Sequence, residues 1–223
     1  YQVDRCIVSN NASHGVYVNS WRSALRLRNA LVVRNGGDGV RTNVDGPQCA
    51  YGHLVDSCTV AYNGGSGLYA QCANPEMAAV TNSIVAGNGA YAFGAAGASV
   101  LDSTVWHSLV YSNAAGIFQS SLAGPWDGFL TADPRFRDPE GDDFRLLAGS
   151  PAVGAGGAIP AGSGREDLEG NPRSGVLDMG CYQSGYAAVR QETVYVDAET
   201  GDDANDGTVP ATAKRTLAEA LAF

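Results

Sequence analysis

The chain has 223 residues with 44% hydrophobic and 17% charged side chains, and its 23 acidic and 14 basic residues give a formal charge of −9. A nucleic-acid surface or an anionic membrane surface requires clustered Lys and Arg, and here the few basic residues are scattered, so neither partner is expected. No apolar run approaches the roughly 18 to 20 residues of a membrane span, and no secretion signal opens the sequence. We expect the natural chain to begin earlier, because Tyr1 already lies inside a repeat.

A fourteen-residue pattern recurs five times in the first half of the chain, at steps of 24, 28, 25 and 20 residues, and such a period is typical of solenoid proteins. The pattern begins at Val3, Leu27, Val55, Val80 and Val100. Its sixth position is always valine, at Val8, Val32, Val60, Val85 and Val105. Its ninth position is asparagine four times and then serine, at Asn11, Asn35, Asn63, Asn88 and Ser108. Its thirteenth position carries Gly15, Gly39 and Gly67.

Each repeat consists of short runs rich in Val, Ile, Thr and Tyr, separated by Asn, Gly, Ser and Asp. This composition predicts strands and tight turns and leaves no room for a helix. Stacked coils lie roughly 4.8 Å apart, so we expect the valines to fill the interior and the asparagines to hydrogen-bond amide to amide along the axis. The glycines at position thirteen are expected where the backbone needs positive φ or a close approach. The sequence therefore predicts an all-β parallel β-helix, a single-stranded solenoid, over residues 1–121.

The five cysteines fall into two groups. The first, fourth and sixth positions of the repeat are expected to face inward, which buries Cys6 and Cys58, and these lie two coils apart, roughly 9.6 Å, beyond disulfide reach. Cys181 is also expected to be buried, whereas Cys49 and Cys72 lie in loops of adjacent coils and their pairing stays open. No zinc site is predicted, because the cysteines are isolated and the three histidines lie apart.

From about residue 122 the repeat gives way to Pro, Asp, Gly and Trp, and we expect residues 122–185 to form a C-terminal cap over the open end of the coil stack. Residues 186–191 are interpreted as a linker. In residues 192–223 the sequence predicts a strand at 194–197, a polar loop at 201–207 and a helix that starts with the capping-box sequence Thr216-Leu217-Ala218-Glu219.

The repeat and the ordered blocks that follow it resemble secreted bacterial right-handed parallel β-helix proteins with a C-terminal choice-of-anchor module. The blocks are Ala132-Asp133-Pro134-Arg135-Phe136, Asp143-Phe144-Arg145-Leu146, Ser150-Pro151-Ala152, Asp167, Gly170-Asn171-Pro172-Arg173 and Asp178-Met179-Gly180-Cys181-Tyr182-Gln183. The resemblance covers most of the chain and implies a right-handed solenoid and an extracellular or cell-surface location. Residues 192–223 resemble the cap that opens a β-helix in such proteins, although here they come last.

The resembled proteins include polysaccharide lyases, hydrolases and epimerases, whose active sites lie in a groove on the outer face of the coils. The best candidate here is a column of alternating charge on successive coils, formed by Asp4, Arg28 and Asp56. An exposed ion-pair ladder explains this column without catalysis and is favoured, because stacked strands commonly alternate charge to avoid like-charge repulsion. The pairs Trp106-His107 and Trp126-Asp127 fit either a sugar site or packing against the cap.

The acidic loop 201–207 is a candidate calcium site. Counting back from Gly207 places Ala204 where an EF-hand requires Asp or Asn, so that motif fails. Two interpretations stay open for the loop. One is a turn stabilised by calcium, and the favoured one is a turn of Asn, Asp and Gly that needs no ion.

Two functions stay open for the chain. The favoured one is a non-catalytic extracellular structural protein, a repeating β-helix unit of a surface array, filament, sheath or adhesin that joins other copies or tandem units head to tail. The alternative is a carbohydrate-active enzyme, a polysaccharide lyase, hydrolase or epimerase, that holds a glycan in the outer groove. No catalytic, cofactor-binding or metal-binding residue is predicted. In the favoured function residues 192–223 engage the next unit, because their short helix needs a partner. The predicted assembly residues are Val194, Tyr195, Val196, Leu217, Leu221 and Phe223.

Overall fold

The structure is a computed structural model of the chain. It describes residues 1–19, 24–44, 53–72, 78–96, 105–119, 126–158, 166–186, 196–205, 212–213 and 215–216. The chain divides into two compact units, Tyr1–Ala188 and Val189–Phe223, which are described separately.

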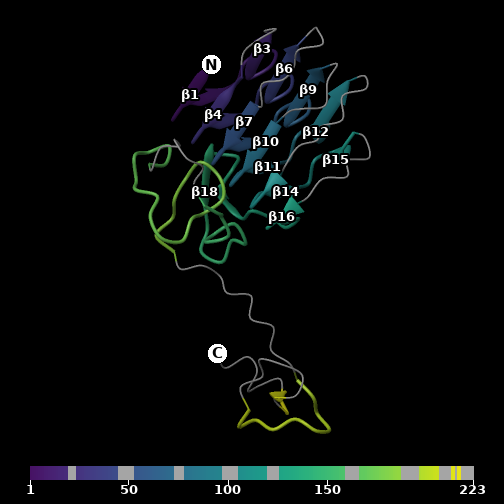
Figure 1. Ribbon diagram of the computed structural model, residues 1–223, viewed down its shortest axis with the longest axis vertical. Helices are drawn as coiled ribbons and strands as arrows, with labels where there is room; N and C mark the ends of the chain where they lie inside the picture. Colours follow the sequence, from purple (N-terminus) through teal and green to yellow (C-terminus); the bar gives the residue numbers. More distant parts are fainter. Residues whose placement is uncertain are drawn as a thin grey trace. The chain divides into compact units, whose positions relative to one another are not determined.

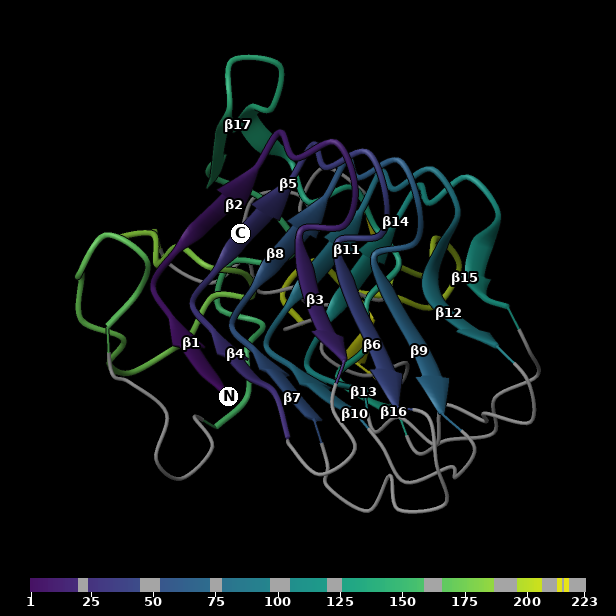
Figure 2. The ribbon, with the colours of Figure 1, turned by 90° about the horizontal axis from the view of Figure 1, so that it is seen from above.

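The first unit is a parallel β-helix in which strands β1 to β15 make five coils of three strands each (Figure 1). Sheet A contains β1 (Gln2–Asp4), β4 (Arg26–Arg28), β7 (His53–Asp56), β10 (Ala78–Thr81), β13 (Val105–Trp106) and β16 (Trp126–Asp127). Sheet B contains β2 (Ile7–Ser9), β5 (Leu31–Val33), β8 (Thr59–Ala61), β11 (Ile84–Ala86) and β14 (Leu109–Tyr111). Sheet C contains β3 (Val16–Asn19), β6 (Val40–Val44), β9 (Leu68–Cys72), β12 (Tyr91–Ala96) and β15 (Gly116–Phe118). In each sheet the strands follow one another in coil order (Figure 2).

The predicted all-β parallel β-helix is confirmed, and the part of the chain that the structure describes includes no α-helix. The interior is filled as the repeat predicted. The sixth-position valines of neighbouring coils pair in register, and Val32, Val60 and Val85 have no exposed surface. Burying these side chains on every coil supplies the hydrophobic stabilisation that the short strands cannot supply by themselves.

The fifth coil begins at Val105 and not at Val100, which corrects the predicted register. Val105 pairs with Val80, and Val110 pairs with Val85. Ser108 consequently takes the fourth position, where its Oγ accepts the backbone N–H of Ser83 at 3.2 Å. Valine stands at both 100 and 105, so the apolar period fits two alignments, and only pairing with the preceding coil distinguishes them.

The ninth-position asparagines form the predicted ladder, which ends at Asn113 instead of Ser108. Each amide Nδ2 donates to the Oδ1 of the next coil over 2.8 to 3.0 Å, through Asn11, Asn35, Asn63, Asn88 and Asn113. The same Nδ2 groups also reach backbone carbonyls, as in the 3.1 Å bond from Asn63 to Val32. Hydrogen bonding of this kind removes the penalty for burying a polar amide beside an apolar core.

The glycines at position thirteen are explained by close approach. A Cβ on Gly39 would lie 2.5 Å from a methyl group of Val60 and 2.8 Å from the carbonyl oxygen of Gly67. Positive φ occurs instead at the third and eighth positions of the repeat, which are the turns between sheets. The third position contributes Arg5, Asn29, Ser57, Asn82 and His107.

Residues 131–158 and 166–186, which are called the module below, pack along the side of the coils. The module contains a hairpin of β17 (Phe136–Asp138) and β18 (Asp143–Leu146), which pair antiparallel. Its apolar side chains cover the outward side chains of β5, β8, β11 and β14. The module residues in this contact are Phe136, Phe144, Leu146, Ala152, Val153, Met179 and Cys181. Of the predicted cap 122–185, residues 126–130 lie at the end of the stack, where β16 pairs with β13 and Leu130 pairs with Leu109. The later described residues lie instead along sheet B, because that sheet is apolar on both faces and its outer face needs a cover.

The first coil extends beyond this cover. Ile7 of β2 occupies the same outward row as Leu31 and Ile84, yet 60% of its surface is exposed, whereas Leu31 and Ile84 are buried.

The cysteine of the module is buried in its contact with the coils. Cys181 has no exposed surface, and burial raises the pKa of its thiol to about 12. Cys58 is buried as predicted, Cys6 is only partly buried, and all three are free thiols. The proposed pair of Cys49 and Cys72 lies outside the described side chains.

A buried carboxylate, that of Asp167, organises the module's loops. It accepts the backbone N–H groups of Glu169, Asn171 and Gln183 over 2.8 to 2.9 Å. Burial by itself would raise the pKa of Asp167, but these hydrogen bonds outweigh it and hold the pKa below its ordinary value. The ionised carboxylate is therefore part of the folded structure.

We expect Asp167→Asn to lower the free energy of unfolding by about 1–3 kcal/mol at pH 7, because backbone donors lose a charged acceptor. Because the folded-state pKa is depressed, the contribution of the ionised group is complete above the ordinary value of about 3.9 and is lost as pH falls below it. Urea unfolding at pH 7, 5 and 3 measures this. The difference between wild type and variant should persist at pH 5 and shrink at pH 3, and a difference that stays constant would contradict the assignment.

The second unit is described at residues 196–205, 212–213 and 215–216. Three of its described carboxylates, those of Asp197, Asp202 and Asp203, accept hydrogen bonds from the chain itself. Asp197 accepts the N–H of Glu199 and Thr200, and Asp203 accepts the N–H of Arg215 and Thr216. Such turns need no ion, and calcium binding in loop 201–207 stays the less favoured of the two interpretations.

The predicted assembly residues fall mostly outside the described part of the second unit. Val196 is described and 41% of its surface is exposed. Val194, Tyr195, Leu217, Leu221 and Phe223, together with the predicted helix, lie outside the described residues. No helix among the residues that the structure describes is long and apolar enough to span a membrane.

Candidate ligand-binding cleft

The alternating charges predicted for the outer face of sheet A lie in one column. Asp4 pairs with Arg28 and Arg28 pairs with Asp56 on successive coils, as expected. The column is not an exposed ladder, however, because Arg28 and Asp56 are 3% and 1% exposed. The sequence could not show this, because the module that closes over this corner comes about a hundred residues later in the chain.

Asp56 has a structural role. Its carboxylate accepts the hydroxyl of Thr81 at 2.7 Å and the amide of Asn82 at 3.2 Å. Asn82 in turn accepts the backbone N–H of Gly157 at 2.7 Å, and its own carbonyl accepts the N–H of Gly180 at 2.7 Å. Asp56 and Asn82 therefore connect two coils to the module. The carboxylate of Asp56 is buried and already hydrogen-bonded, so it does not face a ligand.

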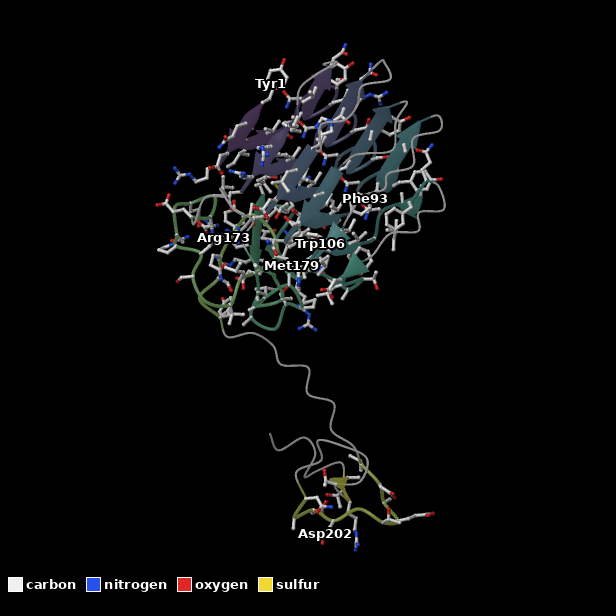
Figure 3. All side chains as sticks on the ribbon, viewed as in Figure 1. Tyr1, Phe93, Trp106, Arg173, Met179 and Asp202 are labelled. Atoms are coloured by element: carbon white, nitrogen blue, oxygen red, sulfur yellow. The ribbon has the colours of Figure 1, made fainter. Side chains whose placement is uncertain are left out.

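The same column continues into an open cleft of about 580 Å³ on sheet A. The floor of the cleft is formed by two small side chains of β10, Ala79 and Thr81. Trp106 lies next to Thr81 on the neighbouring strand β13, and 46% of its surface is exposed. The lining residues are Leu54, Ala79, Thr81, Asn82, Trp106, His107, Asp127 and Ala158. Trp106 belongs to the coils, whereas Arg173 and Met179, also labelled in Figure 3, belong to the module. The cleft is of a size that holds a small ligand or a short stretch of a polymer.

His107 is held at the edge of the cleft between two glycines. A Cβ on Gly157 of the module would lie 2.2 Å from its imidazole, and a Cβ on Gly128 of the next coil would lie 2.4 Å from it. The backbone N–H of His107 donates to the carbonyl of Asp127 at 2.7 Å. Any side chain larger than hydrogen at either glycine would push the ring away, so the two glycines fix the place of the imidazole.

Trp106 and Asp127 are direct neighbours across two strands. They pair in register, so their outward side chains start roughly 4.8 Å apart. Asp127 is exposed and is the one carboxylate among the described residues that line the cleft, and that lining contains neither Lys nor Arg. The cleft thus combines an aromatic face, an imidazole and a negative charge.

Sequence reasoning named Trp106, His107 and Asp127 and missed the floor that makes them a site. The predicted register began the fifth coil at Val100 and therefore put Leu101 beside Thr81. In the structure Trp106 occupies that position, so the contact between Thr81 and Trp106 could not be predicted. The backbone of Trp126 lies in β16 beside β13. Its side chain lies outside what the structure describes.

The remaining histidines take structural roles. The Nδ1 of His53 accepts the N–H of Leu25 at 2.9 Å, and burial lowers the pKa of His53. The Nδ1 of His14 accepts the N–H of Asp38 at 2.9 Å. Within the described ranges, no group of three or more His, Cys, Asp or Glu side chains is placed to hold a metal ion.

Comparisons of the chain with protein-family models, with curated proteins and with solved structures gave no match. The cleft on sheet A is therefore interpreted from its own geometry.

Proposed function

We propose that this chain is a non-catalytic, glycan-binding β-helix of an extracellular surface, and that the cleft on sheet A holds the sugar. The observation that carries the proposal is the half-exposed Trp106 beside the Asp127 carboxylate over a floor of small side chains. A large exposed aromatic in a concave site with few polar groups is a typical binding arrangement. The extracellular location rests on the resemblance to secreted β-helix proteins.

A sugar ring suits this cleft because it has two different surfaces. The C–H groups of a pyranose form an apolar face that stacks on the indole of Trp106. Its hydroxyl groups point outward around the ring, where Asp127 accepts a hydrogen bond and His107 donates or accepts one. The low floor at Ala79 leaves space for the neighbouring sugar of a chain.

Binding is favoured over hydrolysis by the carboxylate content of the cleft. Glycoside hydrolases use a pair of carboxyl groups about 5 to 9.5 Å apart. Asp127 is the one carboxylate in the described lining, and Asp56 is buried below Thr81 and engaged. Release of new reducing ends from a polysaccharide would instead support the carbohydrate-active enzyme.

The proposal keeps the expectation that units join head to tail through residues 192–223. Residues 189–223 form a compact unit of their own, as a segment that engages a neighbouring unit would. In this arrangement each β-helix presents one cleft, and a series of units binds a polysaccharide at several points with increased avidity.

Trp106→Ala tests the proposal. We expect it to weaken binding of a polysaccharide or oligosaccharide that the intact chain binds by about 2 kcal/mol, roughly thirtyfold, because a central Trp is typical of binding hot spots. A glycan array finds the sugar, and isothermal titration calorimetry measures its affinity. Trp106 is half exposed, so thermal unfolding should change little.

Tyr111→Ala is the matched control. Tyr111 is an aromatic residue of the same coil, 40% exposed, on sheet B and away from the cleft. It should leave glycan affinity unchanged. Equal loss in both variants, or no glycan bound by the intact chain, would overturn the proposed function.

A further inference from the structure

We infer that the cleft on sheet A contains an ammonium subsite between Trp106 and Asp127, so that its preferred ligand is a glycan bearing free amino sugars. This inference rests on the proposed function and narrows it. Two features of different chemistry meet there, an indole face and a carboxylate, and both attract a cation. Their strands are hydrogen-bonded neighbours, so one ammonium group can contact both side chains.

The carboxylate of Asp127 is available for this contact. It is exposed, and among the described residues none donates a hydrogen bond to its side chain or forms an ion pair with it. Other acidic side chains of this unit are already engaged, as Asp56 is by Thr81 and Asn82 and as Asp38 is by Arg41. An ammonium group at Asp127 therefore displaces water only and breaks no protein contact.

The indole of Trp106 adds a second attraction. A cation above the face of Trp is stabilised by the ring quadrupole, and Trp is the best of the aromatic side chains for this. An amino sugar can stack its C–H face on the ring while its ammonium group reaches Asp127. An N-acetylated sugar of the same shape keeps the stacking but loses the charge.

Anionic sugars are disfavoured by the same geometry. The described lining contains neither Lys nor Arg to balance a uronate, and the chain's formal charge of −9 adds long-range repulsion. The basic residue in the column that runs from Asp56 through Thr81 and Trp106 to Asp127 is Arg28, which is buried on β4. Counted in coils, β4 is four steps from β16, roughly 19 Å from Asp127.

The test compares three tetrasaccharides of equal length: tetraglucosamine, tetra-N-acetylglucosamine and tetragalacturonate. Each is titrated calorimetrically into the intact chain at low salt and a pH at which the amines are protonated. We expect at least tenfold tighter binding of tetraglucosamine than of its N-acetylated counterpart, and weaker binding of the uronate than of either. The preference should fall as salt is raised, because exposed charges are screened.

Asp127→Asn should reduce the preference for tetraglucosamine over its N-acetylated counterpart to within about twofold, mainly by weakening the binding of tetraglucosamine, because asparagine loses the charge but can still accept a hydrogen bond from a sugar hydroxyl. Glu140→Gln is the control, because it removes the same charge from the exposed turn of the β17–β18 hairpin, away from the cleft. It should leave the preference intact. Thermal unfolding of both variants should match the wild type, since both side chains are exposed.

The outcomes separate the two proposals. Equal affinity for the free and N-acetylated sugars, or a preference that survives Asp127→Asn, overturns the ammonium subsite and leaves glycan binding standing. Preferred binding of the uronate also overturns the subsite. Failure of all three sugars and of a glycan array to bind overturns the proposed function, and the subsite with it.

Discussion

Val60→Asp is expected to destabilise the coil stack severely. Val60 lies on β8 in the third coil, pairs in register with Val32 and Val85, and has no exposed surface. A carboxylate there would be buried between two apolar layers without a partner, and such substitutions belong to the exceptional class above about 4 kcal/mol. Because folded domains are stable by only about 5–15 kcal/mol, a loss of this size removes a large part of the free energy of unfolding. Circular dichroism and urea unfolding measure it.

Tyr62→Asp is the matched control, two residues along the same chain. Tyr62 is 42% exposed and has a φ of 55°, a conformation that Asp tolerates better than most residues. Its ring lies 5.9 Å from that of Phe144, so its loss should cost about 1 kcal/mol. Similar losses of stability in both variants would contradict the inward placement of the sixth position.

Arg173→Leu is expected to release the module from the coils. The side chain is 3% exposed and donates to the Oδ1 of Asn29 at 3.1 Å and to the carbonyls of Asp178 and Gly180 at 3.2 and 2.6 Å. Leucine leaves three buried acceptors without their donor, at about 1–3 kcal/mol each when they are not rescued by water, so we expect a total of about 3–5 kcal/mol.

The loss should be confined to the module, because the interior of the coils does not depend on Arg173. Limited proteolysis should cut within residues 131–186 before it cuts the coils, and the thermal transition should become broader or split in two. Arg137→Leu is the control, since Arg137 is exposed and forms only a surface ion pair with Asp143. Its effect should stay within about 0.5 kcal/mol, and a wild-type proteolysis pattern for Arg173→Leu would contradict the role given to this residue.

The sequence by itself determined the architecture of the coils. The valines at the sixth position and the asparagines at the ninth recur because identical positions of neighbouring coils lie directly above one another. Each residue of a column must therefore pack against, or hydrogen-bond to, the same residue of the next coil. The column of Val32, Val60 and Val85 is stable when it packs into the interior. Asn35 and Asn63 can be buried because their side-chain amides hydrogen-bond to each other. Such constraints act between adjacent repeats, and therefore they are visible in the sequence as a period.

Only the tertiary structure decided the register of the fifth coil, the place of the module and the presence of the cleft. Two valines five residues apart satisfy the apolar period equally well, and the choice of Val105 depends on hydrogen bonds to β10. The module covers sheet B because both faces of that sheet are apolar, yet the coil and module residues of this cluster are about 30 to 150 positions apart and share no period. The cleft likewise needs Ala79, Trp106, Asp127 and Ala158 at once, one residue from each of four segments. Contacts between segments of unrelated spacing leave no repeating pattern in the chain, and so the site could be seen only after the segments had been placed in space.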